Sequence, residues 1–156
     1  DQNLYAINAE TGSGQSLIEA DNWFWVGAVT DGSSIYAPSI DGEIHLLDNH
    51  GNPIGSFHTN GKIVSRPIVM EEGSHNYVVA ATEDGGLYLL RDGAQVCPSR
   101  IGSGTDNVED LLLTPRVKAP LDGSGEIIFL GTDQAEVWSI RINERSCLEK
   151  LWRVDI

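Results

Sequence analysis

A four-residue apolar pattern that returns along the chain constrains the fold more than any other feature. The tetrads at Leu4–Ile7, Ile44–Leu47, Leu87–Leu90 and Val137–Ile140 begin 40, 43 and 50 residues apart. Self-similarity at such a period is typical of repeat proteins, in which each unit buries its apolar face against the next. The sequence therefore predicts a series of similar structural units.

The residues before the tetrads predict β-hairpins. Three tetrads follow an apolar or small-residue run that ends in Ser39, Thr82 or Thr132, and a short polar turn joins run and tetrad. Asp-Gly and Gly-Gly in these turns supply the positive φ that a tight hairpin needs. We expect strands near 34–39, 43–48, 77–82, 86–91, 126–132 and 136–142, and no long helix.

Two further strands complete each unit. Segments 26–29, 65–69 and 114–117 precede the hairpins, and segments 55–58, 95–97 and 151–154 follow them. A four-stranded unit recurring every 40 to 50 residues is the signature of a β-propeller blade. We predict an all-β fold, a partial propeller of antiparallel blades with about three and a half blades visible: an outer hairpin at 3–20 and blades at 22–61, 62–104 and 105–156.

The first tetrad begins too early for a complete blade. Only three residues precede Leu4, and the chain starts at Asp1 without Met or an apolar leader. Propellers close with four to eight blades. We therefore expect an open arc, in which further blades of a parent protein or a second chain pair with the strand near 3–8 and cover the blade at 105–156.

The repeats resemble the PQQ-type, or quinoprotein-like, propeller family, whose blades typically read Asp-Gly-x-Leu-Tyr-Ala-Leu-Asp-x-x-Thr-Gly followed by Trp. Residues 4–12, Leu-Tyr-Ala-Ile-Asn-Ala-Glu-Thr-Gly, are the closest copy, and residues 81–90 match the hairpin half. The resemblance covers nearly the whole chain. It implies one of two groups: quinone-dependent dehydrogenases, or noncatalytic propellers such as the lipoprotein of the outer-membrane β-barrel assembly machinery.

The chain departs from the family where a Trp normally locks neighbouring blades. That position falls on Ser16 in the first repeat and on Gly55 in the second, and the fourth repeat reaches Trp152 only after an insertion. The loss of this Trp from most repeats resembles the noncatalytic propellers more than the dehydrogenases. The resemblance then implies an extracytoplasmic protein, periplasmic or at the cell surface, with any membrane anchor in an unseen N-terminus.

Composition excludes several classes of function. Hydrophobic residues make up 40% of the chain and charged residues 21%, which is ordinary for a globular domain. The net charge of -13 would repel phosphate backbones, so we expect no nucleic-acid binding. No apolar stretch approaches the roughly 18 residues of a membrane helix, so we expect no membrane span.

Catalytic and metal-binding patterns are weak. No adjacent Cys pair, which the dehydrogenases would carry over the quinone, is present. Residues 106–110 are acidic but lack the spacing and central Gly of a calcium loop, and we expect a solvated loop there. His45, His50, His58 and His75 fall at unrelated positions of the repeat, and no Gly-x-Ser-x-Gly elbow supports a hydrolase. We predict no catalytic, cofactor or metal residues; PQQ and calcium belong only to the dehydrogenase alternative.

Cys97 and Cys147 are separated by the same 50 residues that relate Leu87 to Val137. Equivalent outer positions diverge around a propeller, whereas a disulfide needs Cα atoms closer than about 7 Å. We therefore predict two free thiols, or two cysteines that each bond to a separate partner. The number of cysteines alone does not decide the compartment.

Trp23, Phe24 and Trp25 form the densest aromatic cluster. Strand alternation would send the two Trp side chains to one face and Phe24 to the other, so packing between blades is the stronger interpretation. Exposed aromatics are also enriched in binding hot spots, which makes these three residues the candidate partner-binding site.

The leading hypothesis is a noncatalytic, extracytoplasmic propeller that binds a protein or peptide, or serves as a scaffold. The alternatives are a fragment of a quinone-dependent alcohol or sugar dehydrogenase and the sensor propeller of a receptor or kinase. A Cys-Cys pair elsewhere in the parent protein would favour the first alternative. A membrane helix with kinase motifs would favour the second.

Overall fold

The structure, a computed structural model, describes residues 1–97, 117 and 121–156, and these residues contain strands and turns but no helix. None of them therefore lies in a helix that could cross a membrane. The first sheet pairs β1 (Asn3–Ile7) with β2 (Gly14–Glu19). The second holds β3 (Val29–Thr30), β4 (Ser34–Pro38), β5 (Glu43–Asp48) and β6 (Pro53–His58).

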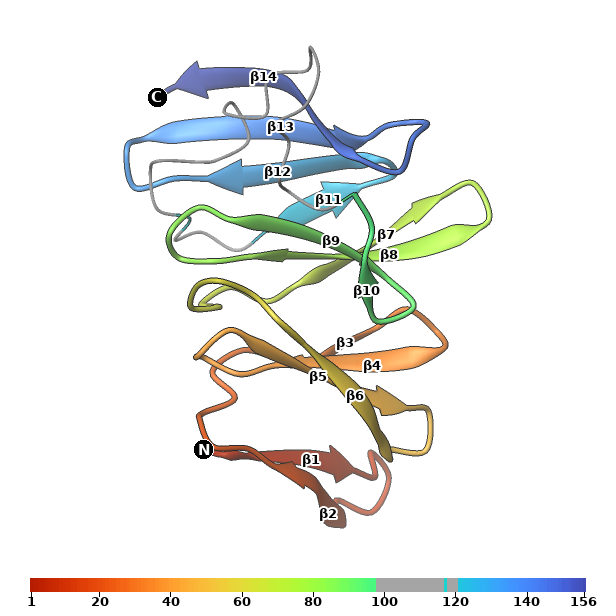
Figure 1. Ribbon diagram of the computed structural model, residues 1–156. Coiled ribbons are helices and arrows are strands. Elements are labelled where there is room, and N and C mark those ends of the chain that lie inside the picture. The colour runs from red at the N-terminus through yellow and green to blue at the C-terminus, as the bar shows by residue number, and fades with distance from the viewer. Residues whose placement is uncertain (98–116, 118–120) are drawn as a thin grey trace.

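Two more four-stranded sheets follow. The third holds β7 (Ile68–Glu72), β8 (His75–Ala81), β9 (Leu87–Arg91) and β10 (Ala94–Gln95). The fourth holds β11 (Asp122–Ser124), β12 (Ile127–Gly131), β13 (Glu136–Ile142) and β14 (Leu148–Asp155). Every pairing is antiparallel and strand order follows chain order, so the sheets succeed one another like the blades of a propeller (Figure 1). The predicted fold class and the six hairpin strands are confirmed.

The three hairpins share one turn geometry. The amide of Ser39 donates to the carbonyl of Glu43, and Thr82 and Thr132 make the same bond to Gly86 and Glu136. The hydroxyl residues that end the first strands thus occupy equivalent positions. Gly42 sits in this turn at φ +96°, and an added Cβ would lie 2.3 Å from the carbonyl oxygen of Gly61. The first of these turns therefore requires glycine for both its dihedral and its packing.

The strands that precede the hairpins begin later than predicted. β7 starts at Ile68 rather than at residue 65, because Pro67 has no amide hydrogen to donate to a ladder. β11 starts at Asp122, whereas Val117 forms only an isolated bridge with Thr132. The rest of the predicted strand at 114–117 lies outside the described residues.

Neighbouring sheets bury two apolar clusters between them. The first interface joins β3–β6 to β7–β10 and buries Ile44, Ile63 and Leu90. The second interface joins β7–β10 to β11–β14 and buries Leu89, Ile128 and Ile140. The sheet β7–β10 thus contributes side chains to both of its neighbours, which is how stacked repeats gain stability.

A buried tyrosine locks the first interface. The hydroxyl of Tyr36 donates to Asp31 Oδ2 at 2.7 Å and accepts from the amide of Gly93, in the β9–β10 turn, at 3.1 Å. Burial and the hydrogen bond to Asp31 together raise the pKa of Tyr36 far above its ordinary value. The hydroxyl therefore stays protonated and bridges two sheets.

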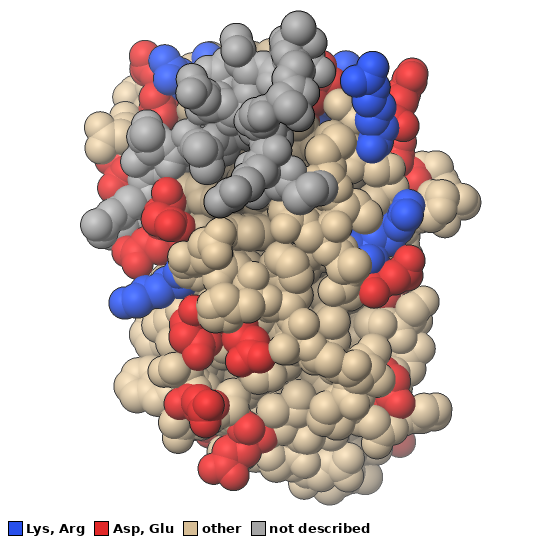
Figure 2. All heavy atoms as spheres, in the orientation of Figure 1, with Lys and Arg blue, Asp and Glu red and all other residues tan. Residues whose placement is uncertain are grey.

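Charge is divided between the two ends of the molecule. Residues 1–61 contain eight Asp and Glu and no Lys or Arg, so the other 15 acidic and all 10 basic residues follow residue 61. Figure 2 shows the result on the drawn face: carboxylates without cations over β1–β6, and both signs over β7–β14. Ion pairs such as Arg141 with Glu149, 2.9 Å, belong to the second group.

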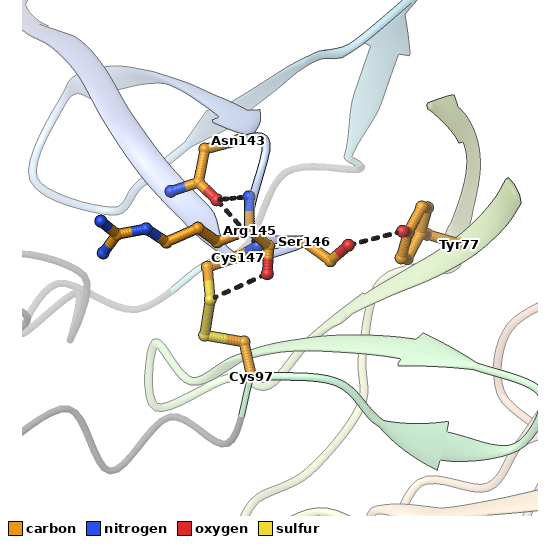
Figure 3. The surroundings of a disulfide bond; sticks show 6 residues. All are labelled: Tyr77, Cys97, Asn143, Arg145, Ser146 and Cys147. Carbon is orange, nitrogen blue, oxygen red and sulfur yellow. Dashed lines mark hydrogen bonds between the residues drawn. A yellow bond between two sulfur atoms is a disulfide. The ribbon is translucent and has the colours of Figure 1, made fainter. Parts of the chain in front are cut away.

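The prediction of free thiols is wrong, because Cys97 and Cys147 form a disulfide with Cα atoms 5.3 Å apart (Figure 3). The hairpin register holds, since Ala81 pairs with Leu87 as Gly131 pairs with Val137. The outer turns differ. Arg91 pairs with Ala94, three residues on, whereas Arg141 pairs with Glu149, eight residues on.

The longer turn places Cys147 directly before β14, where its carbonyl accepts from the amide of Asn143, while Cys97 follows β10. Equal numerical offset is therefore not spatial equivalence. Asn143 shapes this turn by accepting hydrogen bonds from the amides of Arg145 and Cys147, and the hydroxyls of Ser146 and Tyr77 share a further bond of 2.8 Å (Figure 3). The insertion thus reaches across the second interface.

Candidate interaction surface

The aromatic loop, residues 21–25, connects β2 to β3 and presents two indoles to solvent. The side chains of Trp23 and Trp25 are 55% and 62% exposed. Phe24 is half-buried, with its ring centroid 5.4 Å from that of His45 on β5. These residues belong to no strand, yet their side chains alternate. Phe24 anchors the loop, and the two Trp side chains do not join the core between sheets.

Backbone and side-chain hydrogen bonds hold the aromatic loop on both sides. The amide of Phe24 donates to the carbonyl of Asp1 at 2.9 Å, and the amide of Ile40 donates to the carbonyl of Trp23 at 2.8 Å. The side-chain amide of Gln2 donates to the carbonyl of Asp21 at 2.9 Å. A loop fixed in this way loses little conformational freedom when it binds a partner.

A carboxylate lies beside the indoles. Asp41, in the β4–β5 turn, accepts hydrogen bonds from Asn22 Nδ2 at 3.0 Å and from the Ser39 hydroxyl. Partial burial would raise the pKa of Asp41, but these hydrogen bonds outweigh it and lower the pKa below its usual range. Asp21 adds an exposed carboxyl next to Trp23 in sequence. The loop therefore joins two apolar faces to a fixed negative charge.

Other exposed apolar side chains lie at the two ends of the stack. Tyr5 and Ile7 of β1 are exposed, as are Trp152 and Val154 of β14. Within the described residues, β1 pairs with β2 alone and β14 with β13 alone. The expectation that additional strands pair with 3–8 and cover 105–156 stays a prediction.

Two of the open hollows on the described surface lie at the four-stranded sheets. One, of about 480 Å³, is lined by inner-strand residues including Val29, Ile68 and Asp122, and Arg66 at its wall donates to the carbonyl of Ala28. The other, of about 490 Å³, lies beside the β13–β14 turn and is lined mostly by charged residues, among them Glu72 and Arg141.

Metal-binding side chains are dispersed in the described part of the chain, where no three His, Cys, Asp or Glu converge on one point. His45 lies on β5, His50 in the following turn, His58 on β6 and His75 on β8. The acidic run at 106–110 lies outside the described residues. The surface with the most specific chemistry is therefore the aromatic loop.

Comparison with protein-family models and with curated protein sequences finds no match. Comparison with solved structures finds propellers. The fold of BamB from Moraxella catarrhalis matches with a TM-score of 0.72 and 16% identity over 99% of this chain. BBS1N in complex with ARL6DN matches at 0.64 with 13% identity over 99%, and a chain of the mitotic checkpoint complex at 0.65 with 14% identity over 98%.

This chain covers 47%, 46% and 44% of those three chains, respectively, so it spans just under half of each. At such low identity the likeness establishes the fold alone. The chain has a propeller fold resembling that of BamB, and the predicted architecture is confirmed at that level. Sequence reasoning selected the aromatic loop by its density of indoles, but it missed Asn22 and Asp41, which only the folded β4–β5 turn brings beside the loop.

Proposed function

We propose that this chain is part of a noncatalytic, extracytoplasmic PQQ-like propeller that binds another protein or serves as a scaffold. The observation that carries the proposal is the aromatic loop, where Trp23 and Trp25 stay exposed on a backbone fixed by hydrogen bonds to Asp1 and Ile40. Rigid exposed indoles are costly in water and are enriched in binding hot spots. Two similar folds come from assemblies, BBS1N with ARL6DN and the mitotic checkpoint complex.

The extracytoplasmic location draws its support from the disulfide. Structural disulfides persist in oxidising compartments and are rare in the reducing cytosol. Cys97 and Cys147 close a bridge across two sheets, and the β13–β14 turn is shaped to deliver Cys147. Because these cysteines are 50 residues apart in sequence, they are not the adjacent pair that the family resemblance associates with bound quinone.

Partners also fit the ends of the stack. β1 and β14 expose apolar side chains and have pairing partners on one side only among the described strands. Exposed edges of this kind recruit further strands. We propose that further blades of a parent protein, or a second chain, cover them, while the aromatic loop meets a separate partner.

The test is a comparison of two variants in an extracytoplasmic extract. Trp23→Ala/Trp25→Ala removes both indoles. The control, Ile54→Ala, removes an apolar side chain near the start of β6 that is 58% exposed. Photo-crosslinking from position 22 should trap a discrete protein with the parent chain and with Ile54→Ala, but not with the double Trp variant. Equal crosslinking by all three would contradict the proposal.

Catalysis is tested directly. The purified chain, supplied with PQQ, calcium and an artificial electron acceptor, should not reduce the acceptor with common alcohols or sugars. Reduction at enzymatic rates would favour the dehydrogenase alternative and overturn the noncatalytic assignment.

A further inference from the structure

The geometry points to an extended, cationic segment of the partner protein, rich in Lys or Arg, as the occupant of the aromatic loop and its flanking carboxylates. This inference rests on the proposed function and goes beyond it, because it specifies the chemistry of the partner. It is carried by three observations: the charge of the surrounding surface, the pairing of indoles with carboxylates, and the fixed backbone between them.

The part of the chain that carries the aromatic loop has acidic side chains but no Lys or Arg of its own. The first 61 residues, which form β1–β6 and the loop, hold eight acidic residues and no Lys or Arg. By contrast, residues 62–156 hold 15 acidic and 10 basic residues. A cationic segment that approaches the two sheets β1–β6 therefore meets no Lys or Arg belonging to them, and their carboxylates attract it. Arg66, from the segment before β7, reaches only the far side of the loop, where its guanidinium donates to the carbonyl of Ala28. An acidic segment would be repelled.

The indoles and carboxylates complement the two parts of a Lys or Arg side chain. Indole faces bind the guanidinium or ammonium group by cation–π attraction and cover its aliphatic stem. Asp41 stays ionised beside Trp23, since Asn22 and Ser39 donate to its carboxylate. A carboxylate retains lone pairs for a charge-assisted bond to an incoming cation. Asp21, which precedes Asn22 in sequence, is exposed and supplies a second carboxylate to the loop.

A purely apolar occupant fits this surface less well. Covering Trp23 and Trp25 with an apolar segment would also desolvate the neighbouring carboxylates without a compensating charge, which is costly. A cationic side chain satisfies both the indole and the carboxylate. The i, i+2 spacing of the exposed indoles, with Phe24 directed inward onto His45, favours an extended segment that places alternate side chains on one face.

The experiment uses the full 156-residue chain and three soluble 12-residue peptides. The first alternates Arg with Thr, the second replaces Arg by Gln, and the third replaces Arg by Glu. Titration calorimetry and Trp fluorescence report binding. We expect the Arg peptide to bind at least about tenfold more tightly than the Gln peptide at 50 mM salt, with affinity falling toward 200 mM salt. The Glu peptide should not bind.

Variants assign the binding to the loop. Trp23→Ala/Trp25→Ala should lower the affinity for the Arg peptide by about tenfold. Asp21→Asn should lower the same affinity by about threefold. Asp41→Asn tests the second carboxylate, and circular dichroism verifies that the variants fold. Ile54→Ala is the matched control for loss of an exposed apolar side chain and should leave the affinity unchanged.

The outcomes separate this inference from the proposed function. Equal binding of Arg and Gln peptides, or Arg binding that survives the double Trp substitution, would overturn the cationic assignment. If the crosslinked protein of the previous section is still lost in the double Trp variant, the interaction function stands without it. If neither that crosslink nor any peptide depends on the Trp residues, both fail.

Discussion

The two interfaces between the four-stranded sheets use the same hairpins but different locks. The first, between β3–β6 and β7–β10, is held by the buried Tyr36 hydroxyl, which bridges Asp31 and Gly93. The second, between β7–β10 and β11–β14, is held covalently by Cys97 and Cys147. The hairpin register is shared, so the difference arises in the outer turns. The two-residue β9–β10 turn places the Gly93 amide against the Tyr36 hydroxyl. The longer β13–β14 turn places Cys147 within bonding distance of Cys97 on the neighbouring sheet.

The largest expected effect comes from breaking the covalent lock. Cys97→Ser/Cys147→Ser opens a 50-residue loop and should lower the free energy of unfolding by about 4 kcal/mol, through the larger conformational freedom of the unfolded chain. Urea unfolding followed by fluorescence measures the change. Parent protein under full reduction should match the variant, and a loss below about 1 kcal/mol would show that the second interface does not depend on its disulfide.

Packing at the two interfaces is compared by removing one isoleucine from each. Ile44 and Ile128 are both 0% exposed, and Ile→Ala at either position should cost about 3 kcal/mol because it leaves a cavity. Similar losses would mean that the interfaces are packed alike and differ in their locks alone. A much smaller loss at Ile44 would mean that the first interface is loosely packed and relies on hydrogen bonds.

The noncovalent lock is tested with Tyr36→Phe, against Tyr77→Phe at the second interface. Tyr36→Phe should cost about 2 kcal/mol, because it leaves the Asp31 carboxylate and the Gly93 amide short of a buried partner. Tyr77 bonds to the partly exposed Ser146, whose hydroxyl water can satisfy, so Tyr77→Phe should cost about 1 kcal/mol or less. Thermal unfolding of both variants gives the order, and a reversed order would contradict this account.

The smallest effect concerns pH at the anionic end. The folded-state pKa of Asp41 lies below its ordinary 3.8, so its contribution is present above about pH 4 and is lost as pH falls through the folded pKa. Because Asp41 is exposed, the effect should stay well under about 1 kcal/mol. Asp41→Asn should flatten the loss of stability between pH 4 and pH 2.5, and an unchanged slope would show that Asp41 adds nothing.

Sequence reasoning reached the hairpins because their signals are local. Ser39, Thr82 and Thr132 end strands, glycines or short polar residues turn the chain, and the apolar tetrads follow. It failed at the cysteines because an insertion in the β13–β14 turn changes spatial position without changing the numerical period. The Tyr36 lock was also out of reach, since Asp31 and Gly93 meet it only after the sheets stack.

For the aromatic loop, sequence density identified the residues but assigned them mainly to packing between blades. That assignment assumed a strand at Trp23–Trp25. The loop instead leaves β2 and is held by Asp1 and Ile40, so alternation buries Phe24 alone. Hydrogen bonds between segments distant in sequence determine which of these side chains face water, and such bonds cannot be predicted from composition or local pattern.

The bridge between Cys97 and Cys147 also has a mechanical consequence. Under a pulling force applied to the two ends of the chain, tension passes through the sulfur atoms and bypasses the 50-residue loop between them. That loop, which would span about 170 Å when fully extended, is hidden from the force until the bridge is reduced. With the disulfide intact, unfolding of the third and fourth sheets would therefore lengthen the chain by less than their full contour length. Reduction of the disulfide would release the remaining length in one additional step.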